Sequence, residues 1–300
     1  MNKQYGLILG GGIGDVMLEM LKNPLFRRLE AIKRADPSFE VMVIDQVHND
    51  GVTDLFRNCP YVTRHLHVVQ LPQHQGYENF DYSLIPSGTP AVDQYPHWQS
   101  YPEDDPTFTL SEDEERDLQA VLSGGRPVIV IQPFAGLPHR DAFNEPSLTQ
   151  MVYHLDQAGY KIVIIGRDHG RLGAGRQQHV NIHESAHVVN LINRVGLRFT
   201  WHLVNRCAGY IGAHSAFILP TWYWNKPNAL VIPWPSLQPH WDNVDRKYMF
   251  GLGRDNTLVA TYKAEGMDIS TWDYMSLDYN NIVEHFNSFV RPIALKSTTV

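Results

Sequence analysis

The chain has 300 residues, of which 43% are hydrophobic and 19% are charged. This composition is typical of a globular protein with enough apolar side chains for two cores of about 150 residues each. The formal net charge is −7, from 25 Lys and Arg against 32 Asp and Glu, so the chain as a whole lacks a positive field that would bind nucleic acid non-specifically. Cys59 and Cys207 lack CxxC spacing, which disfavours a disulfide framework and a thiolate zinc site.

Hydrophobic runs in the chain are short. None approaches 18 uninterrupted apolar residues, and the run at residues 5–9 is too short for the apolar region of a signal peptide. We therefore expect no stable membrane insertion and a cytoplasmic location, which also suits two unpaired cysteines.

The first half of the chain opens with a strand-helix-strand pattern. A helix is expected around residues 26–35, and Asn23-Pro24 should break or restart this helix between the two strands, because proline has no amide hydrogen to donate. Residues 86–106 have no steady period and are expected to form a long loop of functional interest. Strands are expected at 5–9, 39–44, 66–71 and 80–85.

The second half alternates strands and helices. Ser111 and Glu114 have the spacing of a capping box, which predicts that a helix begins there and ends before Pro127. Strands are expected at 128–132, 161–165, 209–212 and 229–232, and helices near 147–158, 199–206 and 275–290. The pattern predicts an α/β protein with two Rossmann-like doubly wound domains, 1–125 and 126–300, that face a cleft; the last helix could pack on either domain.

Glycines directly follow the first expected strand. Gly12 and Gly14 allow the backbone to approach a ligand closely, and a helix that starts near Asp15 would offer free amides to an anion. Asp15 occupies the place of the third glycine in a GxGxxG motif, where its charge would repel a pyrophosphate. It either caps the helix or faces the cleft as a general base. Asp45, at the end of the second strand, stands where an acid that binds a ribose would lie.

Several segments, taken together, resemble one known family. They include Ile13-Gly-Asp-Val-Met17 and Val128-Ile-Val-Ile-Gln-Pro-Phe-Ala-Gly136, and most of them lie in the second half. The full set is 13–17, 108–114, 128–136, 161–166, 190–196, 203–215 and 226–233. These segments are similar to glycosyltransferase family 9, the ADP-heptose:lipopolysaccharide heptosyltransferases, which have the two-domain GT-B fold.

The resemblance implies an inverting sugar transfer that uses a nucleotide sugar as co-substrate and needs no metal or other cofactor. Asp15 matches the family's base position. The departing diphosphate would be held by main-chain amides and by Arg140, a residue that could equally be an exposed loop arginine. The residues expected on the donor side are Gly12, Gly14, Gln132, Ala135, Gly136, Arg140, Gly166, Arg167, His214, Ser215 and Ala216.

One motif departs from the family. His214, Ser215 and Ala216 stand where the family has Asp-Ser/Thr-Gly, and Leu219 replaces a histidine. Loss of that carboxylate removes an acceptor for sugar hydroxyls, so a nucleotide sugar other than ADP-heptose is expected to be the preferred donor.

Aromatic residues in the long loop are candidates for acceptor binding, because the first domain binds acceptors in GT-B enzymes. Tyr95, His97 and Trp98 suit a glycan core or a modified nucleic-acid base. The second acceptor would require a local basic patch, because the net charge is −7.

Other functions stay open at this stage. The glycines and Asp45 also fit an NAD(P)-dependent Rossmann oxidoreductase, and a non-catalytic nucleotide- or sugar-binding protein would keep the cleft without needing Asp15. His179, His183 and His187 would share one helix face and could bind a metal if that segment were helical, but no carboxylates converge on them. A serine hydrolase is disfavoured, because no GxSxG elbow follows a strand.

Overall fold

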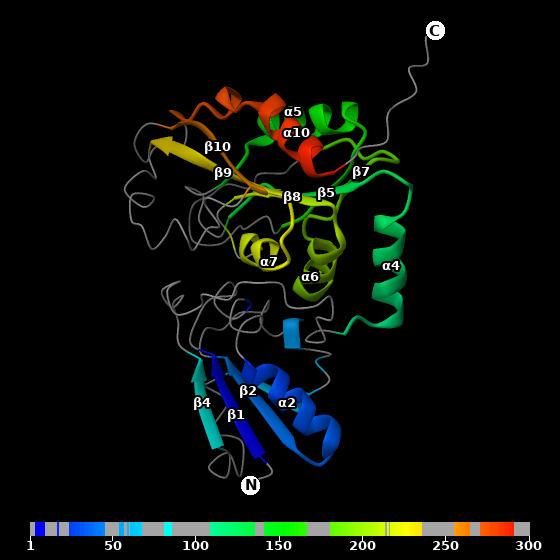
Figure 1. The fold of residues 1–300 in the computed structure, drawn as a ribbon, viewed down its shortest axis with the longest axis vertical. Helices are drawn as coiled ribbons and strands as arrows, with labels where there is room; N and C mark the ends of the chain where they lie inside the picture. Colours follow the sequence, from blue (N-terminus) through cyan, green and yellow to red (C-terminus); the bar gives the residue numbers. More distant parts are fainter. Residues whose placement is uncertain are drawn as a thin grey trace. The chain divides into compact units, whose positions relative to one another are not determined.

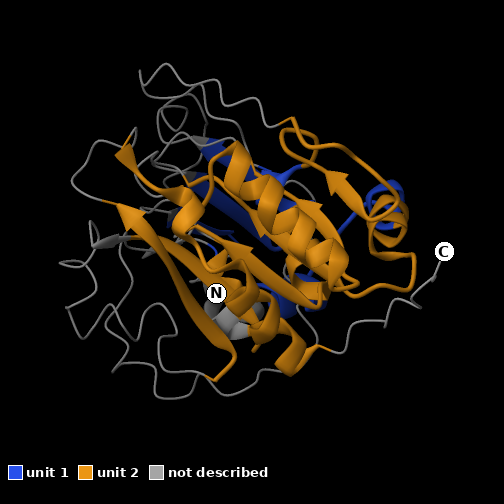
Figure 2. Cartoon of the chain, turned by 90° about the horizontal axis from the view of Figure 1, so that it is seen from above, with its two compact units in different colours: residues 1–90, 99–115, 196–199 blue, residues 91–98, 116–195, 200–300 orange. Residues whose placement is uncertain are grey.

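The computed structural model describes most, but not all, of the chain. The described residues are 4–9, 17, 24–45, 54–56, 59, 61–67, 81–85, 109–135, 141–166, 181–213, 215, 217–235, 255–264 and 271–290. The chain divides into two compact units (Figure 2). Unit 1 comprises residues 1–90, 99–115 and 196–199, and unit 2 comprises residues 91–98, 116–195 and 200–300.

Unit 1 contains a parallel four-stranded sheet in the order β3-β2-β1-β4. The strands are β1 (Gln4–Leu9), β2 (Glu40–Asp45), β3 (Arg64–His67) and β4 (Asp81–Ile85). One of the two inner strands is β2, whose residues 41–44 are all buried, as expected for a parallel strand covered on both faces. Helix α2 (Pro24–Ala35) begins at Pro24, the proline at which a break or restart of the helix was expected.

Unit 2 contains a parallel six-stranded sheet in the order β10-β9-β8-β5-β6-β7. In chain order this is 6-5-4-1-2-3, the order of dinucleotide-binding domains. The strands are β5 (Val128–Gln132), β6 (Lys161–Ile164), β7 (Val188–Asn190), β8 (Gly209–Gly212), β9 (Asn228–Pro235) and β10 (Thr257–Ala264).

Helices cover both faces of the unit 2 sheet. Figure 1 shows α5 (Glu145–Gln157) and α10 (Tyr279–Phe289) over one face, and α6 (Leu197–Arg206) and α7 (Ile218–Tyr223) over the other. α10 packs closely, because a Cβ on Gly209 would lie 2.5 Å from the Phe286 ring. The short 3-10 helix η6 (Tyr274–Ser276) precedes α10. The sheet is therefore doubly wound, as the alternation of strands and helices predicted.

Two of the points at which the chain passes between the units lie inside helices. Helix α4 (Glu112–Leu122) begins in unit 1 and ends in unit 2, and the first residues of α6 group with unit 1 while the remainder group with unit 2. From the sequence, one change of domain was expected, at residues 125/126.

Two strands of unit 2 were not predicted from the sequence. β7 has only three residues, too few for a recognisable pattern. β10 lies at the other edge of the sheet, and Thr261 and Lys263 are exposed between buried residues, so it lacks the continuous apolar run of the central strands. The strand expected at 66–71 is β3, which begins two residues earlier, and residues 68–71 lie outside the described part.

Among the described helices, none combines the length and apolarity that crossing a membrane requires.

The first turn of α5 is held by a reciprocal cap. The Asn144 side chain accepts a hydrogen bond from the Ser147 amide, and the Ser147 hydroxyl accepts one from the Asn144 amide, each at 3.0 Å. We expect Asn144→Ala to lower the free energy of unfolding by about 1 kcal/mol, because the amide loses its acceptor. Asn144→Asp keeps an acceptor at the same place and serves as the control. Urea denaturation of the three proteins measures the difference, and equal midpoints for all of them would contradict the role of the cap.

Candidate functional site

The candidate site lies at the carboxyl edge of the unit 2 sheet, where the strand order reverses. From β5 the chain continues to β6 and β7, and then returns to place β8 on the other side of β5. Gln132, the last residue of β5, is in register with Gly212, the last residue of β8. Ligands of open α/β sheets bind outside the carboxyl ends of strands at such a switch point.

Three polar side chains from the two strands and the following turn meet at this edge. The Gln132 Oε1 atom accepts hydrogen bonds from the Tyr210 hydroxyl at 2.6 Å and from the Ser215 hydroxyl at 2.7 Å. The Gln132 Nε2 atom donates to the main-chain carbonyl of Phe134 at 3.1 Å. The network joins the end of β5 to the turn after β8, so two of the predicted donor residues, Gln132 and Ser215, are in direct contact.

Tyr210 is the buried member of the network. Its side chain has no exposed surface, and burial raises the pKa of its hydroxyl, which therefore stays protonated and able to donate. The Tyr210 ring leans along β8 over Gly212, where a Cβ would lie 2.5 Å from the hydroxyl oxygen. A glycine is therefore needed at the end of β8 if this ring is to reach Gln132.

Hydrogen bonds join the two described ends of the loop between β5 and α5. The buried carboxylate of Asp141 accepts a hydrogen bond from the Ala135 amide at 2.8 Å, and the Ala142 amide donates to the Pro133 carbonyl at 2.8 Å. The Tyr262 hydroxyl donates to the Asp141 carbonyl at 2.7 Å. The Ala135 amide, expected to hold a phosphate, thus has a carboxylate as its acceptor here, and it could hold a phosphate only after releasing Asp141.

Gly166 follows β6 at the same edge of the sheet. Its φ is +135°, a value that favours glycine, and no atom would lie within 4 Å of a Cβ there. Its carbonyl accepts a hydrogen bond from the Asn193 amide at 3.0 Å. Gly166 therefore leaves open space beside the end of β6, the position predicted for a donor-binding residue.

The other predicted site residues lie outside the described part of the chain. On the donor side they are Gly12, Gly14, Asp15, Gly136, Arg140, Arg167, His214 and Ala216, and on the acceptor side Tyr95, His97 and Trp98. The structure therefore brings Gln132 and Ser215 together, places Gly166 on the same sheet edge, and leaves the remaining assignments as predictions.

Histidines and cysteines contribute little to a described site. Residues 181–187 are not helical, so His183 and His187 do not share a helix face, and His179 lies outside the described residues. Within the described ranges no group of three or more His, Cys, Asp or Glu could hold a metal ion. Cys59 and Cys207 are free and buried, and burial raises the pKa of Cys59 to about 12 and that of Cys207 to about 11, so both are protonated at neutral pH.

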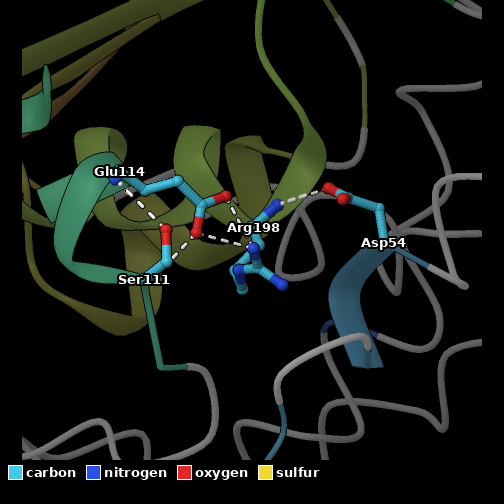
Figure 3. Close-up of polar contacts among 4 residues, drawn as sticks. All are labelled: Asp54, Ser111, Glu114 and Arg198. Carbon is cyan, nitrogen blue, oxygen red and sulfur yellow. Dashed lines mark hydrogen bonds and ion pairs between the residues drawn. The ribbon is translucent and has the colours of Figure 1, made fainter.

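A charged cluster in unit 1 was missed by the sequence analysis (Figure 3). The Arg198 side chain is 3% exposed, and its Nη2 atom donates to both carboxylate oxygens of Glu114 at 2.6 Å. The Arg198 amide, in the first turn of α6, donates to Oδ2 of Asp54 at 3.1 Å. Gly196 permits this contact, because a Cβ there would collide with the Asp54 carboxylate. The cluster links three segments that are remote in sequence.

Glu114 has a second role in the same cluster. Its side chain accepts a hydrogen bond from the Ser111 amide at 2.8 Å, and the Ser111 hydroxyl accepts one from the Glu114 amide at 3.2 Å. This confirms the predicted capping box. Partial burial alone would raise the pKa of Glu114, but the hydrogen bonds from Ser111 and Arg198 outweigh burial and lower it below its ordinary value of 4.5.

Comparisons with known proteins identify the fold. No protein-family model and no curated protein sequence matches the chain. Among solved structures, the chain is similar to the ADP-heptose lipopolysaccharide heptosyltransferase II of E. coli, with a TM-score of 0.54 and 15% identity over 95% of this chain and 98% of that one. It is also similar to a family 9 glycosyltransferase from Veillonella parvula DSM 2008, with a TM-score of 0.53 and 10% identity over 96% and 98% of the two chains.

A third similar structure is the E. coli heptosyltransferase WaaC with ADP-2-deoxy-2-fluoro heptose, with a TM-score of 0.50 and 10% identity over 96% of this chain and all of that one. These structures have the GT-B fold, and the likeness extends over nearly the whole chain. The chain therefore has the GT-B fold, which confirms the predicted fold class. At sequence identities this low, the likeness shows the fold alone.

Removal of Glu114 should leave a buried guanidinium without its counter-ion. We expect Glu114→Ala to lower the free energy of unfolding by about 3 kcal/mol, the lower part of the range for breaking a buried pair, because the Glu114 side chain is 30% exposed. Ser111→Ala removes the cap and keeps the ion pair, so about 1 kcal/mol is expected for this control. Chemical denaturation at pH 7 compares the two variants, and equal losses would show that the ion pair adds nothing to the cap.

The Arg198–Glu114 ion pair should make the free energy of unfolding depend on pH. Because the folded-state pKa of Glu114 is lowered, its contribution is present above its ordinary pKa of 4.5 and is lost as the pH falls through the folded-state value. The wild-type protein should therefore lose more stability between pH 5 and pH 3 than Glu114→Gln does. Parallel losses in the two proteins would contradict this assignment.

Proposed function

We propose that the protein is an inverting, metal-independent glycosyltransferase that moves a sugar from a nucleotide-diphosphate donor to an acceptor hydroxyl. The observation that carries the proposal is the Gln132–Ser215 contact at the switch point of the unit 2 sheet, in a chain with the GT-B fold. Both residues were expected on the donor side from the sequence. The similar structures include a heptosyltransferase with an ADP-sugar analogue, which supports a nucleotide sugar as the donor class.

The proposed reaction is a single displacement at the anomeric carbon. The acceptor oxygen forms a bond to this carbon as the bond to the donor diphosphate breaks, and a general base takes the proton of the acceptor hydroxyl. The nucleoside diphosphate leaves with the bonding electron pair, and its negative charge needs cationic or dipolar groups around it. One displacement inverts the anomeric configuration.

Asp15 is proposed as the general base. In the sequence it follows the glycines that come after β1, and it matches the family position. This assignment disfavours the NAD(P)-dependent alternative, because a carboxylate at that turn would repel a pyrophosphate bound to the same glycines.

The diphosphate is proposed to be held mainly by the loop that follows β5. Arg140 supplies the positive charge, and the amides of Gly136 and Ala216 supply hydrogen-bond donors. The N-terminus of α5 is a poor phosphate site, because the Asn144 and Ser147 amides already donate to each other's side chains and Pro146 has no amide hydrogen. The α7 helix has only six residues and begins at Ile218, so its dipole adds little near Ser215.

Substrate identity is proposed from the departures in sequence. His214 replaces the family's carboxylate, so the preferred donor is expected to be a nucleotide sugar other than ADP-heptose. Tyr95, His97 and Trp98 are proposed to contact the acceptor, which is a glycan core or a modified nucleic-acid base.

Binding of a nucleotide is the first test of this function. In a thermal-shift screen of nucleoside diphosphates and nucleotide sugars, we expect at least one of them to stabilise the protein by about 2.7 kcal/mol at 100 times its dissociation constant. The shift should persist in EDTA, because no diphosphate-bound metal is proposed. A screen without any shift would overturn the function, and a shift that requires a divalent ion would overturn metal independence.

Asp15→Asn tests the general base. We expect the rate of sugar transfer to fall at least about 100-fold, because the amide cannot take the acceptor proton, while donor affinity changes only a few-fold. Asp117→Asn, on the exposed side of α4, is the matched control. A turnover assay with the donor found in the screen provides the measurement, and full activity of Asp15→Asn would remove Asp15 from the mechanism.

A further inference from the structure

The hydrogen bonds around Gln132 determine whether the Ser215 hydroxyl donates or accepts. The Gln132 side-chain amide lies next to the Phe134 carbonyl, with 3.1 Å between Nε2 and that oxygen. The opposite amide orientation would bring two carbonyl oxygens to this distance, where neither can donate. The Nε2 atom therefore faces Phe134, and the Oε1 atom faces the two hydroxyls.

An amide oxygen can only accept, so both hydroxyls must donate to it. Tyr210 does so at 2.6 Å and Ser215 at 2.7 Å, which are short distances for O–H···O bonds. The two hydroxyl oxygens are 3.5 Å apart, and because each hydrogen already points to Gln132, neither hydroxyl donates to the other. The only hydrogen of Ser215 is thus committed inside the protein.

What Ser215 can offer to a ligand is therefore its oxygen lone pairs. A phosphate oxygen accepts hydrogen bonds and cannot use them, whereas a ligand hydroxyl can donate to them. We infer that Ser215 Oγ, oriented by Gln132 and Tyr210, accepts a hydrogen bond from a sugar or ribose hydroxyl of the nucleotide-sugar donor and does not hold its diphosphate. The inference rests on the proposed function and specifies which part of the donor this side chain recognises.

Neighbouring groups fit this polarity. Tyr210 is fully buried and cannot reach a ligand itself, so its hydroxyl acts on Gln132 alone. Ser215 is only partly buried and lies beyond the end of β8, at the edge where a ligand of this fold binds. With a carboxylate absent from position 214, Ser215 supplies a neutral acceptor where the family has an acidic residue beside its Ser or Thr.

Calorimetric titration of the full-length chain with three ligands tests the inference. The ligands are inorganic pyrophosphate, the nucleoside diphosphate with the largest thermal shift, and the corresponding nucleotide sugar. We expect Ser215→Ala to weaken the nucleotide sugar by roughly three- to tenfold, the usual effect of losing one hydrogen bond, and to leave the affinity for pyrophosphate as it is in wild type. Ser288→Ala, at an exposed position of α10, is the matched control.

Deoxy analogues of the tightest ligand identify the hydroxyl. The analogue that lacks the contacting hydroxyl should bind wild type as weakly as the parent ligand binds Ser215→Ala, and Ser215→Ala should weaken this analogue no further. An equal loss for pyrophosphate would show that Ser215 donates to phosphate, and unchanged binding of all three ligands would show that it contacts none. Either result overturns the inference while the function stands. If wild type binds no nucleotide, the proposed function fails together with the inference.

Discussion

The hydrogen bonds on Gln132 connect the two strands on which the candidate site of unit 2 depends. In a parallel sheet the carboxyl ends of all strands lie at one edge, but no short turn joins two neighbouring ends, because parallel strands need a long crossover connection. Neighbouring ends are therefore separated by a gap that only side chains and loops can bridge. Gln132 bridges this gap at the switch point, where its Oε1 atom receives both Tyr210 and Ser215. The orientation of Ser215, and so what it can recognise, follows from the neighbouring Phe134 carbonyl.

In four of the described helices, a side chain accepts a hydrogen bond from one amide of the first turn. Ser111 caps α4, Asn144 caps α5 and Asp278 caps α10, and Asp54 accepts an amide hydrogen bond from the first turn of α6. A phosphate that used one of these amides would have to displace its side-chain acceptor. This is the reason for proposing that the diphosphate contacts Arg140 and loop amides in place of the N-terminus of α5.

The two polar clusters differ in charge: the Gln132 network is neutral, and the Arg198 cluster is ionic. The Gln132 network is neutral, so it orders the sheet edge without the large cost of removing a charge from water. Arg198 is almost fully buried. Its guanidinium donates to Glu114, and its main-chain amide donates to Asp54. Such a pair contributes little compared with apolar packing but is costly to break, because the remaining charge is left buried. The cluster therefore specifies how three remote segments of unit 1 meet.

Local patterns in the sequence determined the order of most strands and helices, the start of α2 at Pro24 and the Ser111–Glu114 cap. These features depend on residues within one turn or one strand, so their signals lie close together. The edge strands β7 and β10 were not predicted, because short or half-exposed strands lack an apolar run. The contacts of Ser215 with Gln132, 83 residues away, and of Arg198 with Asp54, 144 residues away, were decided only by the tertiary structure. Nothing local distinguishes a glutamine that orients a serine, or an arginine that becomes buried, from the same residues at a surface, because their partners are chosen by strand order and packing.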